Sequence, residues 1–255
     1  MKNANNFLLR LGLSLSLLLS LSLSLFSQSA LYHGGYGHFG VGPGWYHDDE
    51  FTKYLQQPSV LGPTFDWNSL GYSAGGEGYA EIRGLLLGGG FYGLALPSMS
   101  TDSASIWSAM GSGYFKTGYL FFQNGRQFAG VMGGFGGGAL TVDIKNNSYE
   151  TNIAFDPRDP IRPGEDIVYY QAYALFDFNL TYKVVASKPS AENQGRYGGF
   201  MFGIDVGSTF GIRMDEWRTE GESTSNISSP DNYFSPYIRI TIGGGGFKRP
   251  ADLKE

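Results

Sequence analysis

The chain has 255 residues, a formal net charge of −5, 39 glycines and no cysteine, and 16% of its residues are aromatic. Without cysteine it has no disulfide and no thiolate site, and we expect no lipoprotein anchor. The acidic balance gives no reason to expect a nucleic-acid partner. Beyond the N-terminal region, no stretch reaches the 18 or so apolar residues of a membrane-spanning helix. These numbers exclude helical membrane proteins and thiol enzymes.

The first thirty residues have the three parts of a secretory signal peptide. Lys2 and Arg10 precede an apolar run of leucines and serines from Leu11 to Phe26, and small residues follow up to Ala30. A basic start, an apolar centre and a small-residue end are typical of an exported chain that is cleaved after this segment. We therefore assign residues 1–30 to a signal peptide.

The next segment, 31–53, is rich in glycine and aromatic residues, and we expect a flexible stretch with little regular structure. We assign residues 54–247 to one β-domain and 248–255 to a polar tail. Tyr54–Leu61 is a candidate extra strand only because it would make the number of strands even. An even number would place both chain ends on the same side of a barrel.

Ile167–Val184 is the clearest strand in the sequence. Its even positions are apolar or small from Val168 to Val184, and its odd positions become polar toward the C-terminal half. Strict period-two alternation indicates a strand with two different faces. Strands of soluble proteins usually have about 5–6 residues, whereas a transmembrane β-strand needs about 9–11. The length of this strand favours a membrane barrel.

Other strands are predicted on both sides of it. They are Tyr79–Arg83, Leu85–Leu96, Tyr114–Gln123, Arg126–Asp143, Tyr197–Arg213 and a last strand from Phe234 through Ile242. Short turns at Gly84 and Asn124-Gly125 alternate with three long polar connections, Pro97–Gly111, Lys145–Asp166 and Met214–Tyr233. Outer-membrane barrels sort their connections in this way, into short periplasmic turns and longer extracellular loops.

The charges of the predicted strands lie on the face opposite the apolar row. A lysine or arginine facing lipid at mid-bilayer costs about 2–4 kcal/mol, so a membrane barrel must turn its charges inward. The predicted lumen charges are Glu81, Arg83, Lys116, Asp177, Lys183, Asp205 and Arg239. The predicted lipid-facing residues are Phe176, Phe178, Leu180, Phe200, Phe202, Ile204, Ile238 and Ile240.

Two substitutions test these faces: Phe178→Arg should block assembly and Asn179→Arg should be tolerated. Because the lumen charges nearly balance, we expect a narrow, salt-bridged interior rather than an ion-selective pore.

The region 79–247 resembles the small bacterial outer-membrane barrels of the OmpA/OmpX type. The resemblance rests on the alternation, on the sorting of the connections by length, and on the last strand with Ile238, Ile240, Ile242 and Phe247. Phe247 is out of phase with the isoleucines, and the polar tail follows it. The resemblance implies an all-β, antiparallel up-and-down transmembrane β-barrel of about eight strands. It also implies that the protein is exported to the bacterial outer membrane and contacts outer-membrane lipid.

We predict a structural or surface-interaction role through the long connections, with a surface ligand or partner that the sequence does not name. Trp107 and Trp217 lie in two of these connections and are candidate contact residues, with interfacial anchoring or loop packing as equally weighted alternatives. A soluble β-barrel or sandwich, periplasmic or extracellular, with a binding role is the alternative. A lipid A-modifying barrel enzyme is the third hypothesis, but its Ser–His pair needs a histidine within about 3 Å of the serine. No histidine lies in the strands predicted above, so we expect no enzyme and no cofactor.

The three histidines, His33, His38 and His47, fall close together, and Asp48 follows the last of them. Imidazole and carboxylate groups together can bind Zn²⁺, Cu²⁺ or Ni²⁺. Their spacing fits no recognised closed site, so these four residues are weak metal candidates and incidental surface histidines are the favoured interpretation.

Overall fold

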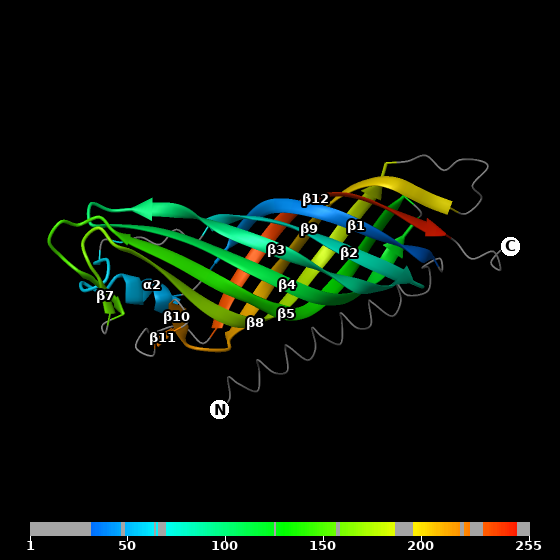
Figure 1. Ribbon diagram of the computed structural model, residues 1–255. Coiled ribbons are helices and arrows are strands. Elements are labelled where there is room, and N and C mark those ends of the chain that lie inside the picture. Colours follow the sequence, from blue (N-terminus) through cyan, green and yellow to red (C-terminus); the bar gives the residue numbers. More distant parts are fainter. Residues whose placement is uncertain are drawn as a thin grey trace, which may run out of the picture.

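The structure is a computed structural model of the whole chain (Figure 1). It describes residues 32–46, 49–63, 65, 70–124, 126–156, 159–186, 196–219, 222–224 and 232–248. The predicted signal peptide and most of the predicted polar tail lie outside these residues. Within them, no helix is long and apolar enough to cross a membrane.

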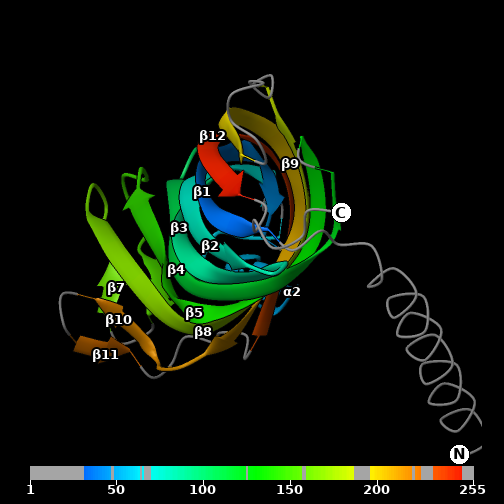
Figure 2. The same cartoon turned by 90° about the vertical axis from the view of Figure 1, so that its right-hand side faces the viewer.

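Eight long strands form a closed antiparallel barrel, which Figure 2 shows from one end. Each strand pairs with the next one in the chain, and the last pairs with the first. The strands are β1 (His33–Trp45), β2 (Leu70–Ile82), β3 (Leu85–Ser100), β4 (Ala104–Gln123), β5 (Gln127–Asn146), β8 (Asp166–Val185), β9 (Arg196–Arg213) and β12 (Asn232–Lys248). The predicted up-and-down barrel is confirmed.

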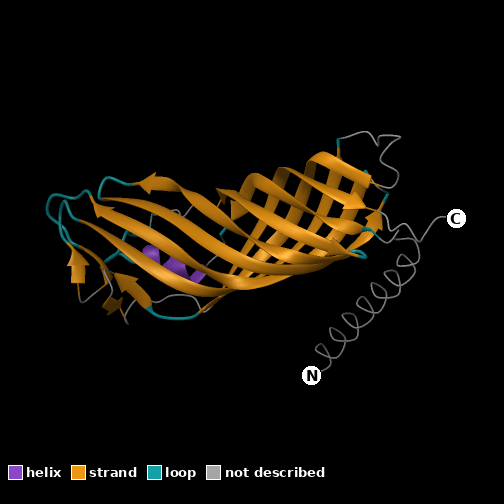
Figure 3. Cartoon of the chain, turned by 45° about the vertical axis from the view of Figure 1, so that its right-hand side comes forward, coloured by secondary structure: helices purple, strands orange, loops and turns teal. Residues whose placement is uncertain are grey.

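The connections at the two ends of the barrel differ in kind. At one end, which we call the turn end, the strands are joined by the shorter connections 83–84, 124–126 and 186–195. At the other end, the loop end, three long connections, 46–69, 147–165 and 214–231, contain all the remaining elements (Figure 3). These are α2 (Asp49–Leu55), β6 (Ile153–Asp156), β7 (Asp159–Ile161), β10 (Trp217–Thr219) and β11 (Glu222–Thr224). We call the described parts of these three connections the head.

The two faces of each barrel strand differ as the alternation predicts. Along β8, exposed and buried side chains alternate almost without interruption from Val168 to Val185. The exposed row is apolar, and the buried row contains Asp177, Asn179 and Lys183. A period of two places successive side chains on opposite faces of a sheet, so the polar row points into the barrel.

The prediction of a flexible segment over 31–53 is wrong, because β1 is a barrel strand and lies between β12 and β2. Glycines at many positions of β1 hide its alternation in the sequence. Several of them are required by close approach to the neighbouring strands: a Cβ on Gly42 would lie 1.9 Å from the backbone oxygen of Ile238. The even strand number was correctly inferred, but Tyr54–Leu61 is not the eighth strand. Its first two residues end α2, and turns follow.

The predicted long loop Pro97–Gly111 is also wrong. β3 continues to Ser100 and β4 begins at Ala104, so only three residues connect them. The register shifts between Leu96 and Met99. A proline has no N–H for the sheet and is tolerated at such irregularities, so Pro97 interrupts the pattern without ending the strand.

The glycine-rich part of β5 is one continuous strand, and its glycines differ in what surrounds them. A Cβ on Gly136 would lie 1.8 Å from the backbone oxygen of Gly113, whereas a Cβ on Gly137 would lie 3.8 Å from its nearest neighbour, the backbone oxygen of Tyr173.

We predict that Gly136→Ala lowers the free energy of unfolding by at least the 1–3 kcal/mol typical of overpacking. Gly137→Ala should leave it nearly unchanged. Urea unfolding of the two variants in lipid vesicles compares them, and equal losses would contradict this account.

Candidate functional site

Most of the inward-facing charges form one layer near the middle of the barrel. The Lys116 ammonium lies 2.5 Å from Glu77 Oε1 and 2.7 Å from Asp177 Oδ1, and all three side chains are buried. Asp177 also accepts hydrogen bonds from the Thr209 hydroxyl at 3.0 Å and the Tyr237 hydroxyl at 2.9 Å. Charge-assisted hydrogen bonds of this kind offset much of the cost of burying the charges.

A second ion pair completes the layer. Lys183 Nζ lies 2.7 Å from Asp205 Oδ1 and donates to the Thr241 hydroxyl at 2.6 Å. His38 Nε2 lies 3.2 Å from the other oxygen of Asp205 and 3.6 Å from Glu77 Oε2. The buried histidine therefore bridges the two ion pairs. We call Glu77, Lys116, Asp177, Lys183, Asp205 and His38 the charge layer.

Apolar side chains close the barrel interior on both sides of the charge layer. Toward the turn end lies a cluster of Tyr32, Tyr36, Tyr79, Leu86, Leu120, Phe128, Met132, Val185, Met201 and Phe247. Toward the loop end lies a larger core that continues into the head, and its aromatic members are Tyr46, Phe51, Tyr54, Phe65, Tyr114, Phe155, Tyr169, Tyr173, Trp217 and Tyr233. An eight-stranded barrel is just wide enough to be filled by side chains, and these two clusters fill it.

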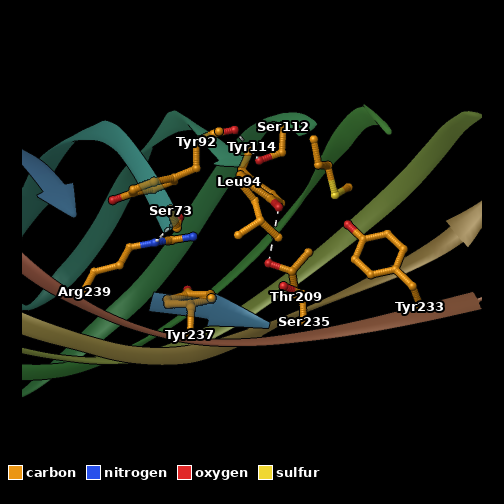
Figure 4. A pocket seen from close by; sticks show the side chains of 13 residues that line it. Ser73, Tyr92, Leu94, Ser112, Tyr114, Thr209, Tyr233, Ser235, Tyr237 and Arg239 are labelled. Carbon is orange, nitrogen blue, oxygen red and sulfur yellow. Dashed lines mark hydrogen bonds between the residues drawn. The ribbon is translucent and has the colours of Figure 1, made fainter. Parts of the chain in front are cut away.

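A small cavity lies between the charge layer and the loop-end core (Figure 4). Its volume is about 20 Å³, and hydroxyl groups from five strands line much of it. The Arg239 guanidinium forms one wall, with its carbon 3.5 Å from the ring centre of Tyr92 and 3.6 Å from that of Tyr237. Cations over aromatic faces are attracted by the ring quadrupole, so the two tyrosines fix the arginine in place.

Six of the seven predicted lumen charges point inward and are buried. Glu81 lies apart from the charge layer, toward the turn end, where it accepts a hydrogen bond from Gln123 Nε2 at 3.3 Å. Arg83 is the exception. It is exposed in the turn between β2 and β3 and has a φ of 55°. The sequence places it in phase with Glu81, but the strand ends at Ile82 and the turn changes its direction.

The predicted metal candidates do not form one site. His33 is exposed at the start of β1, His38 is buried in the charge layer, and His47 and Asp48 lie outside the described residues. The structure instead groups His38 with Glu77 and Asp205, whose ligand atoms all lie within 4.8 Å of one another. Lys116, Lys183 and Tyr79 already contact these two carboxylates. A divalent ion would have to displace an ammonium group, so the arrangement favours ion pairing over metal binding.

The eight residues predicted to face lipid, Phe176, Phe178, Leu180, Phe200, Phe202, Ile204, Ile238 and Ile240, all lie exposed on the outside of the barrel. Their contact with lipid remains a prediction. Other large apolar side chains share this outer surface on the remaining strands, among them Phe39, Phe91, Phe115, Val131 and Phe135.

The two candidate contact tryptophans are placed differently. Trp107 is 45% exposed on β4 and lines a shallow depression with Asp143, Lys145 and Asp166. Trp217 is 1% exposed, so the prediction of an exposed contact is wrong for this residue, and its burial agrees with the loop-packing alternative. Its ring stacks on Phe51, with centroids 5.4 Å apart. Sequence reasoning missed the aromatic core of the head because its members come from three connections far apart in the chain.

Tyr54 links α2 to the β6–β7 hairpin and gives the head a pH dependence. Its hydroxyl donates to the backbone oxygen of Phe155. Burial and, less strongly, the negative charge of Asp156 raise the pKa of Tyr54 to about 12. An unfolded tyrosine has a pKa near 10, so the head gains stability that is fully present below pH 10 and is lost as the pH rises toward 12.

We predict that Tyr54→Phe removes the contribution of this residue to the pH dependence and loses one hydrogen bond, about 0.5–1.5 kcal/mol. The measurement is the midpoint of head unfolding, followed by tryptophan fluorescence between pH 8 and pH 12. Tyr149→Phe is the control, because Tyr149 is 97% exposed. Identical curves for the native chain and Tyr54→Phe would contradict the assignment.

No family model matches the chain, and no curated protein matches it. Several solved outer-membrane barrels resemble its structure. Ail, the attachment invasion locus protein of Yersinia pestis, is 10% identical, with 84% of this chain and 98% of Ail covered and a TM-score of 0.46. Ail in complex with the heparin analogue sucrose octasulfate gives 13% identity, the same coverage and a TM-score of 0.44. Neisserial surface protein A (NspA) gives 9% identity, coverage of 85% and 97%, and a TM-score of 0.35.

Proposed function

We propose that the protein is a bacterial outer-membrane β-barrel that holds an acidic head at the cell surface for interaction with other molecules. The observation that carries this proposal is the contrast between the two faces of the barrel wall. Its outward face is apolar, and the charged side chains of the central strands point inside, where two lysines pair with three acids. Its interior is filled, so transport is not the function that this geometry supports.

The outward face fits a lipid environment. On the central part of the wall, the outward positions of the described strands carry apolar side chains, glycine and a few hydroxyls, and no charged group. Soluble monomers rarely expose a contiguous apolar patch larger than a few hundred Å², whereas this apolar surface continues around the barrel. A closed barrel is also the one β-structure that satisfies all backbone hydrogen bonds within lipid. Both points disfavour the alternative of a soluble β-domain.

Envelope fractionation tests the location. The mature protein should be found with the outer membrane, require detergent for extraction, and migrate differently in electrophoresis before and after heating. Recovery of the folded protein from the soluble periplasmic fraction without detergent would disprove the membrane proposal.

The head is acidic, which defines the kind of partner it fits. The described parts of its three connections contain the acids Asp49, Glu50, Glu150, Asp156, Asp159, Glu165, Asp215, Glu216 and Glu222. The lysines and arginines of the same described parts are Lys53, Arg162 and Arg218. A surface with an excess of one charge attracts partners of the opposite charge and repels those of its own. We therefore propose a cationic partner, such as a basic protein surface.

A binding assay in nanodiscs of zwitterionic lipid distinguishes a cationic partner from an anionic one. A lysine-rich peptide should bind, with an affinity that falls as salt is added, and sucrose octasulfate should not bind. Glu150→Lys and Glu216→Lys, both at exposed positions of the head, should weaken peptide binding. Ala186→Lys, exposed at the turn end, is the control for added charge and should not weaken it. Binding of sucrose octasulfate but not of the peptide would overturn the proposed partner class.

The enzyme hypothesis receives no support from the described residues. His38 is the buried histidine, and its polar contacts are the carboxylates of Glu77 and Asp205 rather than a serine hydroxyl. These contacts of His38 give no support to the nucleophile–base pair that acyl transfer needs.

A further inference from the structure

Arg239 is a buried cation whose hydrogen-bonding capacity is almost unused. Its side chain is 5% exposed, and within the described residues its guanidinium makes one hydrogen bond, from Nε to the Ser73 hydroxyl at 3.1 Å. A guanidinium has five N–H donors. Buried polar groups are normally satisfied by protein, water or an ion, so the remaining donors of Arg239 call for a partner.

The nearby carboxylates do not supply that partner. In the described part of the barrel, Arg239 forms no ion pair, although it lies directly opposite Asp205 in the register of β9 and β12. Asp205 is turned toward Lys183 and His38. Asp177 is held by Lys116 at 2.7 Å and by two hydroxyl groups. The positive charge of Arg239 is therefore left facing the small cavity.

The cavity provides further donors on its other side. In Figure 4 the guanidinium points along the cavity, and the Tyr233 hydroxyl points into it from the opposite end. That hydroxyl is buried and has no hydrogen-bond partner among the described residues. Ser235, in the same strand, also lines the cavity. An acceptor in this space would meet a planar cation on one side and hydroxyl groups on the other.

We propose that this cavity is a binding site for a single chloride ion. The charge of Arg239 selects an anion, and the hydroxyl groups supply uncharged donors. The volume of about 20 Å³ compares with the 10–15 Å³ that one water molecule needs on the same measure, which leaves room for a monatomic ion and not for an organic ligand. The proposal concerns the barrel interior and does not depend on the partner of the head.

Anomalous diffraction with bromide, which substitutes for chloride, tests the site directly. Crystals of the native protein soaked in sodium bromide should show an anomalous peak in the cavity, within hydrogen-bonding distance of the guanidinium. Density for water with no anomalous peak at saturating bromide would overturn the proposal.

A titration in detergent solution supplies the second readout. The unfolding temperature should rise as bromide replaces gluconate at constant ionic strength. Tyr233→Phe removes the inward hydroxyl without leaving a buried group unsatisfied, and it should raise the half-saturating bromide concentration roughly 2- to 12-fold, the effect of one hydrogen bond. Tyr173→Phe makes the same change in the same core at a residue that does not line the cavity, and it should leave that concentration unchanged. Equal effects of the two variants, or a native protein that does not distinguish bromide from gluconate, would contradict a halide site.

Discussion

Replacement of Lys116 by methionine is expected to destabilise the barrel by about 3–5 kcal/mol. The ammonium group neutralises two buried carboxylates, Glu77 at 2.5 Å and Asp177 at 2.7 Å. Without it, both acids remain buried, with side chains that are 2% and 1% exposed. Removal of one partner of a buried ion pair costs more than removal of the whole pair, because the other charge is left without compensation. Urea unfolding in lipid vesicles measures the loss.

Two further variants test whether the charge is responsible. Glu77→Gln in the Lys116→Met background should recover part of the loss, because one stranded carboxylate becomes neutral while Asp177 keeps its hydrogen bonds from Thr209 and Tyr237. Lys145→Met makes the same change at an exposed position of β5 and should alter stability by less than about 0.5 kcal/mol. A loss at Lys116 that is no larger than the loss at Lys145 would show that the charge layer does not stabilise the barrel.

The wall of the barrel could be predicted from the sequence because it follows a local rule. In β8 and β9 almost every second residue is apolar, so Phe176 and Ile204 could be assigned to the outside and Asp177 and Asp205 to the inside. The same rule fails in β1, where glycine occupies positions on both faces. The glycines of β1 are explained by its neighbouring strands, because a Cβ on Gly34 would lie 2.1 Å from the backbone oxygen of Gly246.

The interior and the head could be predicted only in part. The sequence showed that acids and bases nearly balance, but not that Lys116 joins Glu77 and Asp177, because these residues belong to different strands and meet only when the barrel closes. Likewise, Trp217 lies in a polar stretch of the sequence, and this composition predicts an exposed side chain. Its burial depends on Phe51 and Phe155, which come from two other connections. Long-range packing of this kind leaves no periodic signal in the chain.

Phe178→Arg is expected to prevent or severely weaken assembly into the membrane. Phe178 is 61% exposed near the centre of the apolar row of β8, between Gly133 and Ser208 on the neighbouring strands. Neither neighbour carries a negative charge to neutralise a guanidinium, so an arginine would face lipid and cost about 2–4 kcal/mol at the bilayer midplane. The folded fraction after assembly into vesicles, read from the mobility difference between heated and unheated samples, measures this effect.

The structure changes the control for this experiment. Asn179→Arg, expected from the sequence to be tolerated, would place a second cation beside Lys116, whose ammonium lies 3.5 Å from Asn179 Oδ1 in a filled interior. Like charges at this distance repel strongly where water is excluded, so this variant should also destabilise the barrel. Tyr149→Arg adds the same group on an exposed connection and should assemble normally, while Phe178→Leu keeps the outer surface apolar and should do so as well. Normal assembly of Phe178→Arg would mean that this face of β8 does not contact lipid, and the membrane orientation proposed for the whole wall would fail with it.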